Sequence, residues 1–415
     1  MRSPARDDIS FAEIIQIVAG AQRWGVISEN RIIPMNFELT PEQQTLQKAA
    51  IEFAGSELNS NVIERDARQI FSREGWQKCA SFGVQGMPLP KEYGGRGAGP
   101  ITTIAMMEGL GYGGSDQGLL FAINAHMWTC SIPLLKYGTP AQKEKYLPGL
   151  CDGRLIGANG ASEPNAGSDI FSMQTRVTKD GSDYVLNGRK IFVTNAPVAD
   201  LFVLYATVDP QLGAAGISGF VIEKGTAGLR TGERKDKMGL RTALMAEVVL
   251  ENCRVPATAL LGREGRGAEV FHYSMAWERA CILATCLGTM RRQLERCINY
   301  ARARTQFGQP IGKFQSVANR IVDMKLRYEA ARLLIYKTGW LMQENKSADM
   351  DAAMAKLYVS ESFVKSCLDA IQIHGGSGFM TELELEREMR DSVGSTLYSG
   401  TSEIQRNIIA RGLRL

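Results

Sequence analysis

The chain has 415 residues, more than one compact core usually contains, so we expect two or three domains. Its 44% hydrophobic and 22% charged residues exclude a disordered or fibrous protein, and we expect no uncharged apolar run to reach the ~20 residues of a membrane-spanning helix. The formal net charge of only +4 gives no support to nucleic-acid binding.

The cysteines and histidines argue against metal and disulfide chemistry. Eight cysteines are scattered without a CxxC pair, and only three histidines are present. We therefore expect no metal site and no disulfide framework, and we expect reduced thiols in a cytoplasmic protein.

Residues 1–34 differ in composition from the rest of the chain. Four arginines are balanced there by four acidic residues, whereas a transit peptide is poor in acids and a secretory signal ends in small residues. The run MNFELTPEQQ begins afresh at Met35. Two interpretations stay open: a native N-terminal extension, or a protein that starts at Met35 and is preceded here by a stretch that is not native.

Capping signals mark helices in the first part of the chain. Thr40 and Thr139 each begin a Thr-Pro-x-Gln pattern, which is a capping box with Pro at the first helical position. Gly-Gly pairs at 94–95 and 113–114 separate the helical patterns between them. Residues 35–158 are therefore predicted to form an N-terminal helical domain.

The residue pattern changes twice in the remaining chain, first to that of strands and then back to that of helices. Runs such as YVLNGRKIFVTN and ADLFVLYATV, separated by Gly and Asp turns, predict a small antiparallel β-domain over 159–265. Helical patterns return from Gly267 and break at Gln309-Pro310 and Gly375-Gly376, which predicts a helical bundle over 266–415. The fold class is therefore α+β, and the α–β–α order without GxGxxG argues against a Rossmann fold.

One carboxylate lies inside an apolar helical pattern. The helix predicted over 270–290 has Glu278 and Arg279 as its only formal charges, and Glu278 shares a stripe with Met275 and Ile282. A carboxylate buried there loses hydration, its pKa rises, and it becomes a candidate base. A structural ion pair with an arginine of another helix explains the spacing equally well.

Three other segments suit a flat cofactor that carries phosphates. Residues 159–169 form a loop dense in hydroxyls and backbone donors, residues 302–308 supply arginines suited to a pyrophosphate, and residues 372–378 supply glycine amides and a primary amide. Each segment taken singly is more often an ordinary loop or a solvated face. Their joint order favours a cofactor site.

That joint order resembles the acyl-CoA dehydrogenase family of flavoproteins. The matching stretches are LPKEYGG (89–95), ASEPNAGSD (161–169), GRKIFVTNA (188–196), DKMGLRTALMAEV (236–248), RTQFGQPIGKFQ (304–315), QIHGGSGF (372–379) and YSGTSEIQRNIIAR (398–411). The resemblance covers residues 36–415 and implies an N-terminal helical domain, a central β-domain and a C-terminal four-helix bundle. It also implies one FAD per subunit and a homotetramer in which a neighbour completes each FAD site.

The resemblance implies cofactor and substrate contacts at matching positions. The implied FAD contacts are Asn159, Ala161 and Ser162 at the isoalloxazine edge, Phe192 and Thr194 near flavin N5, Arg304, Phe307, Gln315, Gln372, Gly375 and Gly376 toward the FAD of an adjacent subunit, and Thr401 and Glu403 after the C-terminal loop. Ser168 matches a contact to the pantetheine arm of the substrate. Phe192 stands where Trp is commoner in the family.

The chain departs from most of the family at Ser399. The catalytic Glu commonly stands at that position, before the Gly-Thr, and a serine hydroxyl is too weakly basic to replace it. A minority, including isovaleryl- and long-chain enzymes, carries the base on the buried helix just before an Arg, and Glu278-Arg279 matches that place. The resemblance therefore implies Glu278 as catalytic base, with Arg279, Tyr398 and Ser399 beside the substrate.

Within the family, residues 125–133, 194–207, 276–295 and 397–415 resemble the prolyl-carrier-protein dehydrogenases of anatoxin- and pyrrole-type pathways. That resemblance implies oxidation of an L-prolyl group, held as a thioester on an acyl or peptidyl carrier protein, to a 1-pyrroline-carboxyl thioester, expected as the 5-carboxyl isomer. Two alternatives stay open: an acyl-CoA dehydrogenase for short or branched chains, and a non-catalytic flavoprotein scaffold.

A carrier protein is acidic around its phosphopantetheine serine, so basic side chains would help it to dock. Two groups of cations close in sequence are candidates: Arg230, Arg234, Lys235, Lys237 and Arg241, and Arg291, Arg292 and Arg296. An ordinary solvated surface is the commoner explanation of such groups. We expect no nucleic-acid or membrane partner.

Overall fold

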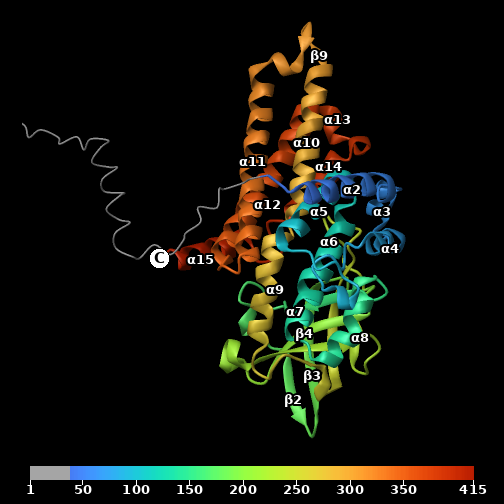
Figure 1. The fold of residues 1–415 in the computed structure, drawn as a ribbon, viewed down its shortest axis with the longest axis vertical. Coiled ribbons are helices and arrows are strands. Elements are labelled where there is room, and N and C mark those ends of the chain that lie inside the picture. The colour runs from blue at the N-terminus through green and yellow to red at the C-terminus, as the bar shows by residue number, and fades with distance from the viewer. Residues whose placement is uncertain (1–37) are drawn as a thin grey trace, which may run out of the picture. The chain divides into compact units, whose positions relative to one another are not determined.

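The computed structural model describes residues 38–415, so the two interpretations of residues 1–34 lie outside the described residues. The unit Pro41–Leu415 opens with helices (Figure 1). These are α2 (Pro41–Glu57), α3 (Val62–Arg68), α4 (Arg73–Phe82), α5 (Pro100–Gly113), α6 (Gln117–His126), α7 (Ile132–Tyr137) and α8 (Pro140–Cys151). The capping box predicted at Thr139 is formed at the start of α8.

Helix α6, a π-helical turn over Met127–Ser131 and α7 form one continuous apolar stretch. These 21 residues are long and apolar enough to cross a membrane by length and composition, so the expectation that no run reaches this length was wrong. The apolar composition reflects packing, because 83% of the most apolar window is buried inside the protein, in a core shared with α2 and α5.

The middle of the chain forms one sheet of eight strands, in the order β6-β7-β3-β2-β4-β5-β8 with β1 paired to β4. The strands are β1 (Gly157–Gly160), β2 (Arg176–Asp180), β3 (Asp183–Thr194), β4 (Leu201–Thr207), β5 (Ile217–Glu223), β6 (Leu229–Thr231), β7 (Met245–Pro256) and β8 (Leu260–Leu261).

The expectation of a purely antiparallel β-domain is wrong, because the sheet is mixed. Strands β1 and β2 each pair with β4 in parallel, while the other neighbours are antiparallel. The segment 161–200, which includes β2 and β3, connects β1 to β4, and a connection of that length lets the two strands run in the same direction. The strand pattern of a sequence does not reveal the direction of the partner strand.

Helices return after the sheet, with a short hairpin among them. They are α9 (Gly267–Cys281), α10 (Ala284–Ala303), the hairpin β9–β10 (Thr305–Gln306 and Gln309–Pro310), α11 (Gln315–Gln343), α12 (Asp349–His374), α13 (Gly376–Phe379), α14 (Leu385–Gly394) and α15 (Ser402–Gly412). Helices α10, α11 and α12 pack side by side, and α9 lies lower, toward the strands (Figure 1). The hairpin and the φ of 59° at Gly375 confirm the two predicted breaks.

The helix predicted over 270–290 is interrupted between α9 and α10. The Thr285 hydroxyl donates to the Ile282 carbonyl (3.4 Å), which competes with the regular helical pattern. Helix α5 also lies directly against this turn, since a Cβ on Gly111 would sit 1.9 Å from the Thr285 carbonyl oxygen. Tertiary packing therefore shapes the end of the helix that carries Glu278.

Candidate active site

Glu278 lies near the end of α9, and only 7% of the residue is exposed. Burial raises the pKa of its carboxyl from 4.5 to about 7, although the nearby Ser399 hydroxyl and the Arg279 and Lys356 cations each lower it in part. Both cations donate to backbone carbonyls of the loop after α14. The predicted burial of Glu278 is confirmed. The alternative was an ion pair with an arginine of another helix, and no such ion pair is present among the described residues.

The loop between α14 and α15 is held beside α9 by hydrogen bonds to its backbone. The Ser399 carbonyl accepts from Arg279 Nε (3.3 Å) and Gln405 Nε2 (3.1 Å). The Gly400 carbonyl accepts from Lys356 Nζ (2.8 Å) and from Gln405 Nε2 (2.7 Å). Ser399 has a φ of 59°, which is costly for a residue with a side chain, so these four bonds hold the loop in a strained conformation.

Aromatic side chains surround this region. The Tyr398 ring packs on Phe121 with centroids 4.6 Å apart, and Trp277 stacks on Trp128 at 6.0 Å. Burial raises the pKa of the Tyr398 phenol well above its ordinary value, so the phenol stays neutral. The carboxylate of Glu278 therefore faces a poorly hydrated, largely apolar neighbourhood.

The π-helical turn joins the helix of Glu278 to the strand of Asn159. Its wider backbone spacing leaves carbonyls without a regular helical partner, and side chains from other elements bond two of them. Ser274 Oγ of α9 donates to the Trp128 carbonyl (3.1 Å), and Asn159 Nδ2 of β1 donates to the Thr129 carbonyl (3.1 Å). The base helix and the predicted flavin-edge strand are thus tied to one rigid turn.

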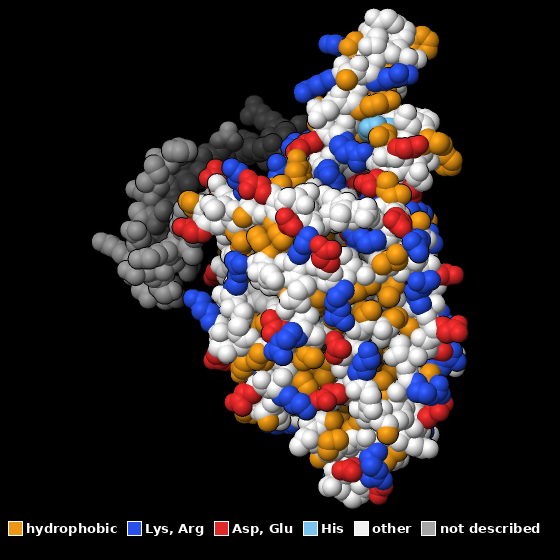
Figure 2. Space-filling model, turned by 90° about the vertical axis from the view of Figure 1, so that its right-hand side faces the viewer, with side chains coloured by type: hydrophobic (Ala, Val, Ile, Leu, Met, Phe, Trp, Pro, Cys, Tyr) orange, Lys and Arg blue, Asp and Glu red, His pale blue; other side chains and the backbone are white. Residues whose placement is uncertain are grey.

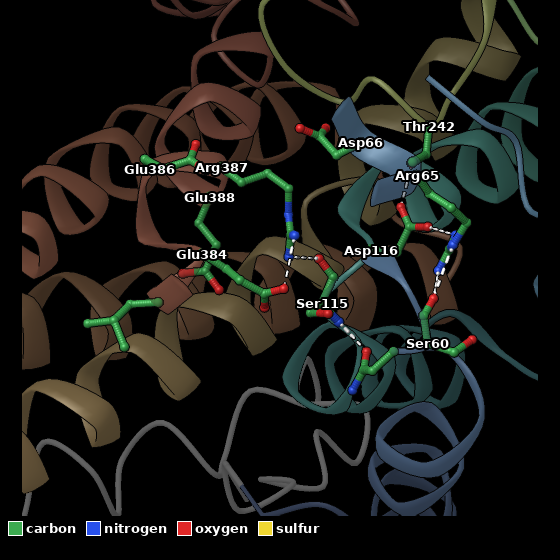
Figure 3. Close-up of polar contacts among 12 residues, drawn as sticks. Ser60, Arg65, Asp66, Ser115, Asp116, Thr242, Glu384, Glu386, Arg387 and Glu388 are labelled. Atoms are coloured by element: carbon green, nitrogen blue, oxygen red, sulfur yellow. Dashed lines mark hydrogen bonds and ion pairs between the residues drawn. The ribbon is translucent and has the colours of Figure 1, made fainter. Parts of the chain in front are cut away.

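A second polar network fixes the start of α6 (Figure 3). The Asp116 carboxylate accepts from the hydroxyl of Thr242, which belongs to the 236–248 motif, and forms an ion pair with Arg65. Arg387 of α14 donates to the Ser115 carbonyl (3.1 Å). These contacts connect α6, the 236–248 segment and α14, so they set where α14 delivers the loop that contains Ser399.

The loop 161–169 is clamped by a buried ion pair. Lys190 of β3 is fully buried, and its Nζ donates to Glu163 Oε1 (2.7 Å) and to the Ala161 carbonyl (3.3 Å). The Glu163 carboxylate also accepts from the backbone N–H groups of Gln174 and Thr175. Burial lowers the pKa of Lys190 to about 8, and Lys190 together with these donors holds the pKa of Glu163 below its ordinary value despite its burial.

The clamp determines which way one peptide group points. In a planar trans peptide the carbonyl of one residue and the N–H of the next point in opposite directions. Because the Ala161 carbonyl points inward to Lys190, the Ser162 N–H points outward, and no described residue accepts a hydrogen bond from it. An outward backbone donor in a glycine-rich loop suits the acceptor edge of a heteroaromatic ring.

The end of β3 also fits a flavin. Phe192 is 67% exposed and has a φ of 56°, at a register shift between β3 and β7, and Thr194 follows it in the strand. An exposed aromatic ring on a strained, bulged strand is typical of a ligand surface rather than of a core. The residues present therefore fit the ring system of FAD.

The other residues implied for FAD lie elsewhere in the chain. Arg304 caps the end of α10, directly before the β9–β10 hairpin, and Phe307 lies in the turn of that hairpin. Figure 1 shows the hairpin at the end of α10 and α11 opposite the sheet, and Phe307 is 92% exposed. Gln315 starts α11, and Gln372, Gly375 and Gly376 lie where α12 meets α13. Thr401 caps α15, whose first turn contains Glu403, and Ser168 is exposed on the 161–169 loop. One chain does not bring the hairpin residues to Ser162.

Most of the cations considered for carrier docking serve the protein's own structure. Six have partners within the chain: Arg230 with Glu251, Arg234 with the Gln69 carbonyl, Lys237 with the Leu240 and Ala243 carbonyls, Arg291 with Glu295, Arg292 with Glu388, and Arg296 with the Leu383 carbonyl. On the face in Figure 2, cations and anions are interspersed rather than gathered. Contacts within the protein therefore account for these six, and some of them, such as Lys237 and Arg292, are not solvated surface residues.

Sequence reasoning missed the residues that support the site. The sequence analysis predicted no contact for three residues that hold the two loops in place: Lys190, Lys356 and Gln405. One signal was present, because Lys190 stands at an inward position of an alternating strand, where a charge requires a buried partner.

Comparisons with known proteins agree along the whole described chain. Three family descriptions match: acyl-CoA dehydrogenase N-terminal domain (residues 40–154), middle domain (158–253) and C-terminal domain (265–414). An L-prolyl-[peptidyl-carrier protein] dehydrogenase of a Serratia species is 44% identical over 381 residues, covering 92% of this chain and 99% of that protein. Two solved structures have a TM-score of 0.90: the prolyl acyl carrier protein oxidase AnaB (52% identical, covering 91% of this chain and 100% of AnaB) and PigA with FAD and proline (44%, 92% and 100%).

Proposed function

The chain belongs to the acyl-CoA dehydrogenase family, and we propose that it oxidises an L-prolyl group held as a thioester on an acyl or peptidyl carrier protein, with FAD as its cofactor. The observation that carries this proposal is similarity over nine-tenths of the chain to proteins named for that reaction. The site supports it independently, because Glu278 is a buried carboxyl with a pKa of about 7 and the loop position 399 carries no second carboxylate.

The reaction removes one proton and one hydride from the prolyl ring. When bound, FAD supplies the two-electron acceptor of the hydride from the ring atom next to Cα. The thioester acidifies the Cα hydrogen, and the Glu278 carboxylate takes it as a proton. The poorly hydrated surroundings of Glu278 keep the carboxylate basic and exclude water. The first product therefore has its new double bond at Cα, as a dehydroprolyl thioester. The 1-pyrroline-5-carboxyl isomer that we propose as the final product has its double bond between the nitrogen and the far ring carbon, so it forms from this dehydroprolyl thioester by proton shifts that return a hydrogen to Cα.

Asn159, Ala161, Ser162, Phe192 and Thr194 would hold the flavin ring. Ser162 presents its outward backbone N–H, and the ion pair of Lys190 with Glu163 keeps that peptide oriented. We assign Arg279, Tyr398 and Ser399 to the substrate side of Glu278, and Ser168 to the pantetheine arm. Thr401 and Glu403 follow at the start of α15.

The mass of the carrier protein tests this function. After incubation of the FAD-loaded protein with L-prolyl-loaded carrier protein in air, we expect the phosphopantetheine-bound group to lose two hydrogens, measured by mass spectrometry of the released arm. A loss of four hydrogens would show oxidation to a pyrrole. An unchanged prolyl group, together with turnover of butyryl-CoA or isovaleryl-CoA, would contradict the substrate assignment and favour the acyl-CoA alternative.

We also propose that the protein is a homotetramer. Helix α11 exposes Val322, Leu326, Leu333 and Trp340, and their spacing of four, seven and seven residues places them on one face. An exposed apolar stripe of this kind suits a subunit interface. Such an interface would let the exposed Phe307 and its neighbours Arg304 and Gln315 complete the FAD site of an adjacent subunit.

The eight cysteines support a cytoplasmic location. All of them are buried and unpaired, and burial raises the pKa of each thiol. A reducing compartment suits such thiols.

A further inference from the structure

The hydroxyl of Ser399 is a buried polar group whose hydrogen bonding to the Glu278 carboxyl lowers the pKa of that carboxyl. Its Oγ atom is inaccessible to solvent and has no hydrogen bond of regular geometry among the described residues. Buried hydroxyls are ordinarily hydrogen-bonded, and an orphaned one next to a reacting group calls for an explanation. Two other hydroxyls of the same loop do have partners: Ser395 Oγ donates to the Ser392 carbonyl (2.6 Å), and Thr396 Oγ1 to the Val393 carbonyl (2.8 Å). Ser402 Oγ, at the start of α15, is likewise without one among the described residues.

The backbone of Ser399 leaves its side chain little freedom to find a partner elsewhere. Its φ of 59° is unusual for a non-glycine residue, and its carbonyl is bonded by Arg279 and Gln405. Arg279 follows Glu278 directly, so the loop is pinned to the turn of α9 that carries the base. The hydroxyl lies close enough to Glu278 to lower the pKa of that carboxyl.

The chemistry of the proposed substrate supplies the missing partner. The carbon that Glu278 deprotonates is Cα of the prolyl ring, and the ring nitrogen is bonded directly to that carbon. A group beside the Glu278 carboxyl therefore lies beside the nitrogen of a substrate placed for proton transfer. An aliphatic acyl chain has only carbon and hydrogen at the same place, so it would offer the hydroxyl oxygen no donor.

We propose that Ser399 is a specificity-determining residue, whose hydroxyl accepts a hydrogen bond from the ring nitrogen of the prolyl group. With its own hydrogen, the hydroxyl can donate to the Glu278 carboxylate, so that it bridges the base and the substrate nitrogen. This inference rests on the proposed function. Most of the family carry a carboxylate at this position. In this chain the residue at the same position distinguishes an amino-acyl ring from a hydrocarbon chain.

The test compares two thioesters on the same carrier protein. One carries L-proline, and the other carries cyclopentanecarboxylate, which has the same ring size but no nitrogen. The rate at which each bleaches the flavin absorbance is measured anaerobically in single turnover, for the wild type and for Ser399→Ala. Alanine keeps the Cβ, so the cost of the positive φ is unchanged and only the hydroxyl is lost. Ser399→Gly, which suits that φ, is the second variant without a hydroxyl.

We expect Ser399→Ala to reduce the preference for prolyl over cyclopentanecarbonyl by at least about 10-fold, the loss falling on the prolyl thioester. Ser395→Ala is the matched control: it removes a buried hydroxyl of the same segment that already has a protein partner, and its preference should equal that of the wild type. A structural effect of the loop would slow both thioesters together and leave their ratio unchanged.

The outcomes separate this inference from the function on which it rests. If the wild type is bleached by the prolyl thioester and both Ser399 variants keep its preference, the specificity role of Ser399 is wrong and the proposed function stands. If the wild type is not bleached by the prolyl thioester at all, the proposed function is wrong, and the role of Ser399 falls with it.

Discussion

Replacement of Glu278 by glutamine is expected to slow flavin reduction by the prolyl thioester by about 10³-fold, because an amide has the shape of the carboxylate but cannot accept the Cα proton. The measurement is the anaerobic bleaching rate of the variant against the wild type. FAD content should be unchanged, since Glu278 bonds none of the elements that hold the flavin loop. A Glu278→Gln protein with normal bleaching would rule out Glu278 as the base.

The pH dependence of the wild type gives an independent check. The base form of Glu278 forms as pH rises through about 7, so the bleaching rate should rise with pH to a plateau above that value. Glu278→Gln should lack this rise of the rate with pH.

The effect of pH on stability through Glu278 has the opposite sign. The pKa of the folded state lies above the ordinary 4.5, so the contribution of this group is fully present below pH 4.5 and is lost as pH rises through about 7.

Replacement of Lys190 by methionine is expected to lower the free energy of unfolding by about 3–5 kcal/mol, because it leaves the Glu163 carboxylate buried without its cation. The Ala161 peptide also loses the donor that orients it. A hydrogen bond to the ring is then misplaced, and FAD affinity should fall about tenfold. Thermal unfolding of the FAD-free protein measures the first effect, and titration with FAD measures the second.

The double variant Lys190→Met with Glu163→Gln is the control for the buried charge. It removes both charges, while the glutamine amide oxygen can still accept from the backbone N–H of Gln174 or Thr175, so part of the stability should return. FAD affinity should stay low, because the Ala161 carbonyl still lacks its donor. Normal FAD affinity in Lys190→Met would show that the ion pair does not position the flavin loop.

Local patterns were enough to predict the elements and the unusual carboxylate. The α–β–α order, the capping box at Thr139, the breaks at Gln309-Pro310 and Gly375-Gly376 and the burial of Glu278 each follow from a signal within a few residues. Helix caps, turn residues and stripes act locally, which is why a single sequence reveals them. The roles of the implied FAD and substrate residues stay proposals.

Features that depend on distant contacts could not be predicted in this way. The parallel pairing of β1 with β4, the break between α9 and α10 beside Gly111, and the burial of Lys190 against Glu163 all depend on segments far apart in the chain. The cations near residues 230–241 illustrate the same limit. In the sequence, Arg234 and Lys237 indicate a basic surface. In the structure, both side chains donate hydrogen bonds to backbone carbonyls of other turns.

The most direct test of a carrier-dependent prolyl dehydrogenase is an anaerobic titration of the FAD-loaded protein, followed at the flavin absorption band. We expect one equivalent of L-prolyl-carrier protein to bleach the band, and butyryl-CoA and isovaleryl-CoA at the same concentration to leave it unchanged. Bleaching by the CoA esters, with the band untouched by the prolyl-carrier protein, would contradict the assigned substrate.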